Sequence, residues 1–306
     1  MTTITLGERE IREAVTMHEV IDAVRRGFVD LAGGEFEMPV RTPLGDGKFM
    51  VMSAHHRSTA SAVIKTLSLN SERRPVIAGT VVWSETGSLD HLVADAGVVT
   101  TLRTGAAVGV ATDLLAAPEA GRLTLIGAGA QAPDQVRAVH AVRPLSRLTV
   151  VGRDPRRTQA LLETLAPELA GVELLASTDA ESAVAEAEIV CCATNATSPL
   201  FRESALPARV HVNAIGSYRP TMRELPDELL ASSTVVIDDL DATLAEAGEI
   251  IQALDAGVIA KDDLTELGTA LTDTAAEYGE RTVFKTVGVA AQDWALAHLL
   301  ADKFLP

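Results

Sequence analysis

The stretch that decides the fold is LTLIGAGAQA, Leu123–Ala132, an apolar run that ends in two glycines and an alanine spaced G-x-G-x-x-A. The apolar run predicts a strand, and the helical spacing of valines in Val136–Val142 predicts a helix after the turn. In such a unit Gly127 permits the tight turn, Gly129 lets the backbone approach a bound pyrophosphate, and Ala132 allows close packing of helix on strand. The positive end of the helix then attracts the phosphates. The stretch therefore predicts a Rossmann-type turn that binds a dinucleotide.

A regular alternation of strands and helices surrounds this turn, from Arg122 onward. Six short apolar runs follow one another: RLTLIG, SRLTVVG, GVELLA, AEIVCCAT, RVHVNAIG and STVVIDD. Helix-length stretches separate the first four, which favours parallel strands in a doubly wound α/β sheet. We expect residues 116–287 to form this Rossmann dinucleotide-binding domain.

The chain before this domain has a different pattern. Apolar positions at helical spacing cover residues 7–32, and a helix rich in small residues begins at Thr100 and ends before Pro118. Between them lie four β-rich runs separated by turn residues: FMVMSA, SAVIKTLSL, IAGTVVWS and LDHLVAD. A last apolar segment at helical spacing lies near the end of the sequence. We expect residues 1–115 to form a smaller α+β domain, completed by about 288–306.

The composition excludes several classes of function. The chain has 306 residues, 47% of them hydrophobic, and a formal net charge of -16. A global negative field repels nucleic acid and anionic lipid, so neither is an expected partner. No apolar run reaches the ~18 residues of a membrane span, and no apolar h-region follows the start, so we expect a cytoplasmic protein. The only cysteines, Cys191 and Cys192, are adjacent in an apolar run and suit a buried core better than a disulfide or a metal site.

The end of the second strand bears on the type of dinucleotide. An acidic residue there would bind the ribose 2′-hydroxyl of NAD, whereas arginine accommodates the 2′-phosphate of NADP. Gly152 stands where the acid is expected, and Arg153, Arg156 and Arg157 follow it. This pattern favours NADP(H). Asp154 keeps NAD(H) open, and a solvated arginine cluster is the alternative without a ligand.

Three cations in the first part of the chain stand in unusual surroundings. Arg41 follows Met-Pro-Val in a loop, Lys65 interrupts the apolar strand AVIKTL, and Arg103 opens the small-residue helix. Such residues are most often solvated or paired. An enzyme that uses a dinucleotide must nevertheless fix a substrate carboxylate, and Arg or Lys does so by charge-assisted hydrogen bonds. His55 and His56, upstream of Lys65, are candidate acid-base groups.

The segment TTLRTGAAVGVAT, one strand ahead of LIGAGAQA, resembles the ornithine cyclodeaminase/mu-crystallin family. The resemblance extends through AVIKTLSLN, ATNATSPL, VNAIGSYRPTMREL and TVFKTVGVAAQDWALA, and so covers nearly the whole chain. It implies a homodimer of two-domain subunits in which the smaller domain binds substrate and forms the dimer contact. It also implies an NAD(P)-dependent oxidoreductase acting on a small amino or imino acid. Members include ornithine cyclodeaminase, an alanine dehydrogenase, and reductases of ketimines such as pyrroline-2-carboxylate and piperideine-2-carboxylate.

By the same resemblance, Arg41, Lys65 and Arg103 match the residues that hold the substrate carboxylate. Thr194, after the fourth Rossmann strand, matches the position under the cofactor, and Gly288 matches the loop near the nicotinamide. The full set of residues expected to contact the cofactor is Thr104, Gly127, Ala128, Gly129, Ala130, Gln131, Gly152, Arg153, Arg157, Thr194, Gly216 and Gly288.

One position departs from the pattern of ornithine cyclodeaminases. In those enzymes the segment that matches Gly216–Pro220 carries an aspartate proposed to handle the substrate amine and water, and here Tyr218 occupies its place. A neutral phenol cannot pair with the distal ammonium of ornithine and is a poor base at neutral pH. Reduction of an imine, or dehydrogenation of a simple amino acid, is therefore favoured over cyclodeamination.

We expect hydride transfer from NADPH to the carbon of a C=N bond next to a carboxylate. Lys65 is the first candidate for the proton that keeps the imine nitrogen charged, with Tyr218 and His56 as alternatives. Three other functions stay open: an alanine or opine-type dehydrogenase, ornithine cyclodeaminase, and a non-catalytic NADPH-dependent binding protein of the mu-crystallin kind.

Overall fold

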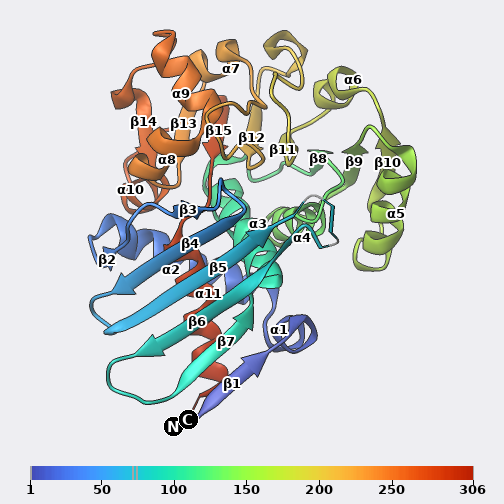
Figure 1. Ribbon diagram of the computed structural model, residues 1–306. Helices are drawn as coiled ribbons and strands as arrows, with labels where there is room; N and C mark the ends of the chain where they lie inside the picture. The colour runs from blue at the N-terminus through green and yellow to red at the C-terminus, as the bar shows by residue number, and fades with distance from the viewer. Residues whose placement is uncertain (1, 71, 74, 306) are drawn as a thin grey trace. The chain divides into compact units, whose positions relative to one another are not determined.

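The computed structural model describes residues 2–70, 72–73 and 75–305. The chain divides into two compact units (Figure 1): unit 1 combines Met1–Ala107 with Gly288–Pro306, and unit 2 is Val108–Val287. We expected the first boundary at 115/116. The division instead falls inside helix α3 (Ala96–Leu115), which contributes residues to both units.

Within the described residues, unit 1 holds a seven-stranded sheet whose neighbours are antiparallel except for β1 and β7. Its strands are β1 (Thr3–Leu6), β2 (Phe36–Glu37), β3 (Thr42–Leu44), β4 (Phe49–His56), β5 (Ser61–Leu69), β6 (Ile77–Glu85) and β7 (His91–Asp95). Strands β4 to β7 are the four β-rich runs of the sequence. Strands β1, β2 and β3 were not expected, because none of them stands out as an apolar run bounded by turn residues.

Besides the first part of α3, unit 1 contains the helices α1 (Glu8–Ala14), α2 (Met17–Ala32) and α11 (Ala290–Phe304). Helix α11 packs on strands β4 to β7, α2 packs on α11, and α1 contacts β1 and α11. The sequence predicted one helix over 7–32, but the chain breaks at Thr16. The Thr16 hydroxyl accepts a hydrogen bond from the Glu19 amide, and the Glu19 carboxylate accepts one from the Thr16 amide (2.7 Å). This capping box starts a new helix.

Side chains alternate across β5, and this alternation places one cation inside unit 1. Val63, Lys65 and Leu67 are buried, whereas Ile64 and Thr66 face outward. Helix α11 packs on β5 and meets its buried face. Because side chains alternate between the two faces of a strand, Lys65 lies on the same buried face as Val63 and Leu67 and points toward α11.

Unit 2 holds an eight-stranded sheet, again within the described residues, in which every pairing is parallel. Its strands are β8 (Arg122–Ile126), β9 (Arg147–Val151), β10 (Glu173–Ser177), β11 (Ile189–Cys192), β12 (Val210–Ala214), β13 (Thr234–Ile237), β14 (Leu264–Glu266) and β15 (Arg281–Lys285). The strand order is β10-β9-β8-β11-β12-β15-β13-β14. The six apolar runs are β8 to β13, which confirms the prediction of a parallel α/β sheet.

Helices connect these strands. They are α4 (Ala132–Val142), α5 (Pro155–Leu165), α6 (Ala180–Ala185), α7 (Asp227–Ala231), α8 (Leu240–Glu246), α9 (Gly248–Asp255) and α10 (Leu267–Thr272), with 3₁₀ turns at Ala166–Glu168, Glu203–Ala205 and Lys261–Asp263. Two strands were not expected, β14 and β15, because each is short and lacks a clear turn signal on both sides. Strand β15 lies between β12 and β13, so the sheet is not in chain order there.

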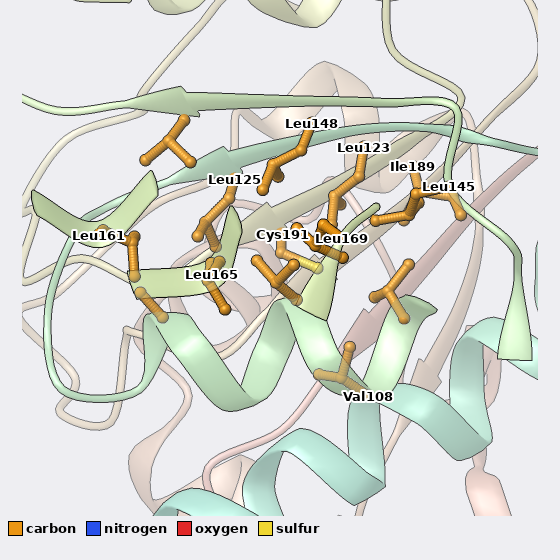
Figure 2. Packing of buried hydrophobic residues seen from close by; sticks show 14 of the residues in the cluster. Val108, Leu123, Leu125, Leu145, Leu148, Leu161, Leu165, Leu169, Ile189 and Cys191 are labelled. Atoms are coloured by element: carbon orange, nitrogen blue, oxygen red, sulfur yellow. The ribbon is translucent and has the colours of Figure 1, made fainter. Parts of the chain in front are cut away.

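The apolar core of unit 2 gathers side chains from β8, β9 and β11 against helices, as Figure 2 shows. Leu125, Leu148 and Leu165 are fully buried in it. Cys191 belongs to the same cluster, and burial raises the pKa of its thiol to about 12. Cys191 and its neighbour Cys192 are free thiols in the core, as their apolar context predicted.

The strand order of unit 2 reverses between β8 and β11. At such a switch point of a parallel sheet, ligands bind outside the carboxyl ends of the strands. Gly127 follows β8 and Thr194 follows β11 at this end. The topology therefore places the predicted turn where proteins of this architecture bind their ligands.

Among the described helices, α3 alone is long and apolar enough to cross a membrane. Most of this helix is buried inside the protein, as the core helix of a globular domain is. Packing accounts for its apolar composition.

Candidate functional site

The glycine-rich turn after β8 has the geometry that its sequence predicts. Gly127 has a φ of 113°, and a Cβ there would lie 2.4 Å from the Ala193 carbonyl oxygen, so only glycine fits. A Cβ at Gly129 would meet nothing within 4 Å, which leaves this backbone open to a ligand. Helix α4 begins at Ala132, and the buried Oε1 of Gln131 has no hydrogen-bond partner among the described residues. The turn is closed toward the sheet and open at the start of the helix.

One of the charged residues after β9 contacts this turn. Arg157 donates a hydrogen bond from Nη2 to the Ala128 carbonyl (3.1 Å), and Arg153 is exposed. The Asp154 carboxylate caps α5 by accepting a backbone N–H of that helix (3.0 Å). A Cβ at Gly152 would lie 2.4 Å from a threonine hydroxyl of α5. Arg157 therefore lies at the turn, while Asp154 is engaged as a helix cap.

A buried carboxylate that the sequence analysis did not single out joins the ends of β11 and β12. Glu224 accepts hydrogen bonds from the Thr194 amide (2.7 Å), the Thr194 hydroxyl (2.8 Å) and the Gly216 amide (2.7 Å). Burial raises the pKa of Glu224 to about 7, although the Lys285 charge opposes the rise. Lys285 is itself paired with Glu249 (3.3 Å). Thr194 and Gly216, both expected at the cofactor, are thus brought together by one acidic side chain.

In unit 1 another carboxylate joins two of the predicted cations. Both oxygens of Asp293, on α11, accept hydrogen bonds from Lys65 Nζ at 2.7 Å, and Oδ1 also accepts one from Arg103 Nε at 3.2 Å. Arg103 Nη1 donates to the side-chain oxygen of Gln292, whose Nε2 is buried without a partner in the described chain. All four side chains are buried. Asp293 and Gln292 were not predicted, although a polar pair inside the apolar run of α11 is a usable signal.

This cluster carries more positive than negative charge. Burial lowers the pKa of Lys65 to about 8, Asp293 opposes this, and the charges of Arg103 and Arg41 lower the pKa further. The Arg41 charge is the smallest of these effects, whereas Lys65 and Arg103 are joined directly through Asp293. Three cations with one carboxylate favour the binding of an anionic ligand. Lys65 is protonated at neutral pH and can also donate a proton there.

Two residues expected at the cofactor lie beside Arg103. Thr104 follows it on α3 and is buried. Gly288 has a φ of 83°, and a Cβ there would lie 2.3 Å from an Arg103 guanidinium nitrogen. Glycine thus lets the chain before α11 pass directly over the guanidinium. In unit 2, the ring of Tyr218 lies 5.4 Å from the guanidinium carbon of Arg219.

His56 is packed into an aromatic stack. Its ring stacks on Trp294 at 4.1 Å, its Nδ1 lies 2.8 Å from Thr59 Oγ1, and its Nε2 lies 3.5 Å from the Asp30 carboxylate. Burial is the largest effect on His56 and lowers its pKa, so the ring is neutral at pH 7. These contacts give His56 a packing role and do not place it with Lys65.

A parallel α/β unit with a glycine-rich turn, joined in one chain to a unit with a buried cation cluster, defines a two-unit protein of the Rossmann-type class. The sequence pattern of the ornithine cyclodeaminase/mu-crystallin family matches residues 1–306. The chain belongs to this family, which confirms the resemblance found in its motifs.

Several proteins of known name are similar to the chain over nearly its whole length. It is 30% identical over 314 residues to a Delta(1)-pyrroline-2-carboxylate reductase of Bacillus cereus, covering 98% of this chain and 96% of the reductase. It is 35% identical over 335 residues to an L-lysine cyclodeaminase of Streptomyces rapamycinicus, covering 100% and 92%. Among solved structures, Thermococcus litoralis Delta(1)-pyrroline-2-carboxylate reductase in complex with NADH and L-proline matches with a TM-score of 0.91 and 27% identity, covering 99% of this chain and 97% of that one.

Replacing Asp293 with asparagine should destabilise unit 1 by about 3 kcal/mol, because two buried cations lose their counter-charge. The free energy of unfolding is measured by urea titration at neutral pH. Asp302→Asn, on the same helix but with a side chain that is 64% exposed, is the matched control, and its stability should change by less than about 0.5 kcal/mol. Equal stability of the Asp293 variant and the wild type would show that these ion pairs make no net contribution to the free energy of unfolding.

Proposed function

We propose that the protein is a nicotinamide-dependent reductase of a cyclic ketimine with a carboxylate next to its C=N bond, of the pyrroline-2-carboxylate or piperideine-2-carboxylate type. The observation that carries the proposal is the buried group of Lys65, Arg103 and Asp293, in which a lysine with a lowered pKa lies beside a fixed guanidinium. The names of the Bacillus and Thermococcus relatives support this reaction. L-proline, bound to the second of them, is the saturated counterpart of pyrroline-2-carboxylate.

The residues of the glycine-rich turn fit a dinucleotide. The open backbone at Gly129 and the start of α4 offer N–H donors, so this part would hold the pyrophosphate. The unpartnered Oε1 of Gln131 can accept a hydrogen bond from a bound group. Thr194 and Gly216 would contact the nicotinamide half. When bound, the reduced dinucleotide supplies the hydride.

The cations of unit 1 would bind and orient the substrate. Arg41 and Arg103 would hold its carboxylate by charge-assisted hydrogen bonds, which fixes the orientation of the imine carbon. Lys65 would donate a proton to the imine nitrogen, because an iminium carbon accepts a hydride more readily than a neutral imine does. Its neutral amine would then accept a hydrogen bond from the iminium N–H. A pKa of about 8 leaves Lys65 charged at neutral pH and still able to release a proton. Asp293 fixes the position of the Lys65 ammonium.

Cyclodeamination of a diamino acid is the second candidate, because the L-lysine cyclodeaminase of Streptomyces rapamycinicus shares 35% identity with this chain. The position of Tyr218 argues against it. The Arg219 guanidinium lies over the Tyr218 ring, and a cation there disfavours a substrate with a second ammonium group.

The purified protein should consume NADPH or NADH when given pyrroline-2-carboxylate or piperideine-2-carboxylate, followed by nicotinamide absorbance. Lys65→Met should lower kcat/KM by about a thousandfold, because the group that protonates the imine is lost, and should leave the Kd for the dinucleotide unchanged. Lys261→Met, which removes an exposed lysine of unit 2, is the control and should behave as the wild type.

Other outcomes of the same substrate panel would reject the reductase. Ammonia release from ornithine or lysine without turnover of the ketimines would identify a cyclodeaminase. Turnover of pyruvate with ammonia alone would identify an alanine dehydrogenase. Dinucleotide binding without turnover of any substrate would identify a binding protein. Near-normal turnover in the Lys65 variant would remove this lysine from the mechanism.

We infer that NADP(H) is the preferred dinucleotide. Gly152 has no room for a side chain where an acid would bind the ribose hydroxyl, and Asp154 is engaged as the cap of α5. Arg157, bonded to the Ala128 carbonyl, and Arg153 supply positive charge beside the turn. Arginine recognises a 2′-phosphate by charge-assisted hydrogen bonds. The Thermococcus relative is bound to NADH, so this preference is a property to be tested in the present chain.

Replacing Arg153 and Arg157 together with alanine should raise the Kd for NADPH by about tenfold, whereas the Kd for NADH should change by less than about twofold, because NADH has no 2′-phosphate. Both constants are measured by titration of nicotinamide fluorescence. Arg202→Ala, at an exposed site of the same unit, controls for loss of charge. An equal loss of affinity for both dinucleotides would contradict a role in recognising the 2′-phosphate.

We propose that unit 1 forms a homodimer through the outer face of its sheet. Ile64 and Val82 lie opposite each other on β5 and β6 and are 51% and 38% exposed. Val82 in turn pairs with Val93 on β7. Val93 is partly buried, so an apolar row with two exposed side chains crosses three strands, and such a row is typical of an interface. A second copy presents the same face, and a twofold contact pairs such a face with itself.

The double substitution of Ile64 and Val82 by glutamate should convert the protein to a monomer, because the charges would repel across a twofold contact. The mass in solution is measured by light scattering after gel filtration. Leu175→Glu, which changes a similarly exposed side chain in unit 2, should keep the wild-type mass. A wild-type protein of monomer mass would contradict the proposed contact.

A further inference from the structure

Glu224 lies in the segment between β12 and α7, and this segment is bonded to the one that follows β11. The Arg223 amide donates to the Ala196 carbonyl (2.9 Å), and the Leu200 amide donates to the Glu224 carbonyl (2.9 Å). These backbone bonds hold the Glu224 carboxylate against Thr194, where it accepts two hydrogen bonds. The side chain is fully buried. Its place is therefore determined by the loops that it connects.

Three residues expected at the cofactor contact one another above this carboxylate. A Cβ at Gly216 would lie 2.1 Å from the Thr194 carbonyl oxygen and 2.5 Å from a Glu224 oxygen. A Cβ at Gly127 would lie 3.3 Å from the Thr194 side chain. A side chain on either glycine would meet Thr194, so both glycines pack closely against this residue.

We propose that Glu224 is a positioning residue whose ionised carboxylate holds the loops after β11 and β12 in the arrangement that receives the dinucleotide. This inference rests on the proposed dinucleotide site and adds a residue to it. Both carboxylate oxygens accept a backbone N–H, one from Thr194 and one from Gly216. Protonation of Glu224 would turn one of its carboxylate oxygens into a hydroxyl donor that faces a backbone N–H group. Loss of the negative charge would also weaken the hydrogen bonds that the carboxyl group still accepts.

Charged and titratable groups on three elements face Glu224. Lys285 on β15 favours its ionised form, whereas Glu249 on α9 disfavours it. The thiols of Cys191 and Cys192 on β11 interact electrostatically with Glu224, and burial raises the pKa of both, so they stay neutral. Burial is the largest effect on Glu224 and raises its pKa to about 7. The ionised fraction therefore falls as the pH drops through about 7, and the affinity for the dinucleotide should fall with it.

Glu224→Gln tests the inference, with Glu249→Gln as the matched control. Each variant removes one buried carboxylate from the same charged group, but the Glu249 carboxylate makes no hydrogen bond to either loop in the described structure. Lys285 keeps its hydrogen bond to the Ser217 carbonyl (2.6 Å) in both variants. Binding of NAD⁺, which lacks a 2′-phosphate that would itself titrate, is measured by calorimetry below and above the pKa of Glu224. Thermal unfolding of each variant is measured at the same pH values.

The wild type should bind NAD⁺ more tightly as the pH rises through about 7. Glu224→Gln should bind NAD⁺ about tenfold more weakly than the wild type at high pH, because a backbone N–H loses its hydrogen bond to a charged acceptor. The affinity of this variant should not vary with pH. Glu249→Gln should keep the pH dependence with its midpoint at a lower pH, because the Glu249 charge raises the pKa of Glu224.

Equal affinity and equal pH dependence in the wild type and Glu224→Gln would overturn the inference. A loss of affinity in Glu224→Gln that is the same at every pH and matches a loss of thermal stability would also overturn it. A wild type that binds neither NAD⁺ nor NADP⁺ would reject the proposed function instead. Amide exchange at Thr194 and Gly216 then decides the role of Glu224: faster exchange in Glu224→Gln alone supports it, and unchanged exchange refutes it.

Discussion

The buried carboxylate of Asp293 is the interaction on which unit 1 depends. It accepts hydrogen bonds from Lys65 on β5 and from Arg103 on α3, and it lies in the first turn of α11. An isolated cation in an apolar interior loses its hydration without compensation, so neither Lys65 nor Arg103 could stay charged and buried without this partner. The pairing also joins the last helix of unit 1 to its sheet. The same contact therefore serves both the packing of the unit and the charge that a substrate carboxylate requires.

Unit 2 uses a buried carboxylate for a different purpose. Glu224 accepts hydrogen bonds from backbone groups of Thr194 and Gly216 rather than from cations. Asp293 thus holds two charges in place, whereas Glu224 holds two loops. A lysine offsets the negative charge of each carboxylate. Lys285 lies near Glu224, and Lys65 hydrogen-bonds Asp293 directly. Both arrangements position groups in advance of binding, which reduces the cost of ordering them when a ligand arrives.

Much of the fold could be predicted from local patterns. Alternation over nine residues is enough to identify β5 as a strand, and the spacing of glycines in Leu123–Ala132 is enough to identify the turn. Strands β1, β2, β3, β14 and β15 were missed because none of them stands out as an apolar run bounded by turn residues. The break between α1 and α2 was missed although Thr16 and Glu19 have the spacing of a capping box. In that case the signal was present and the continuous apolar spacing concealed it.

The candidate site was predictable only in part, for a related reason. Lys65 and Arg103 could be identified as candidate site residues because a cation in an apolar run is unusual. Asp293 is 228 residues from Lys65, so no local pattern links the two. The contact of His56 with Trp294 on α11 is likewise long-range, and no local pattern in the sequence indicates it.

The sequence by itself determined the alternation of strands and helices around the glycine-rich turn, the turn itself, the family, and the identity of the cations, because each of these follows from residues that are neighbours along the chain. Only the tertiary structure decided which carboxylate pairs with Lys65 and Arg103, and which one joins Thr194 to Gly216. Those partners come from α11 and from the loop after β12. Long-range pairing of this kind depends on how distant segments pack together, and the spacing of residues within one segment does not indicate that packing.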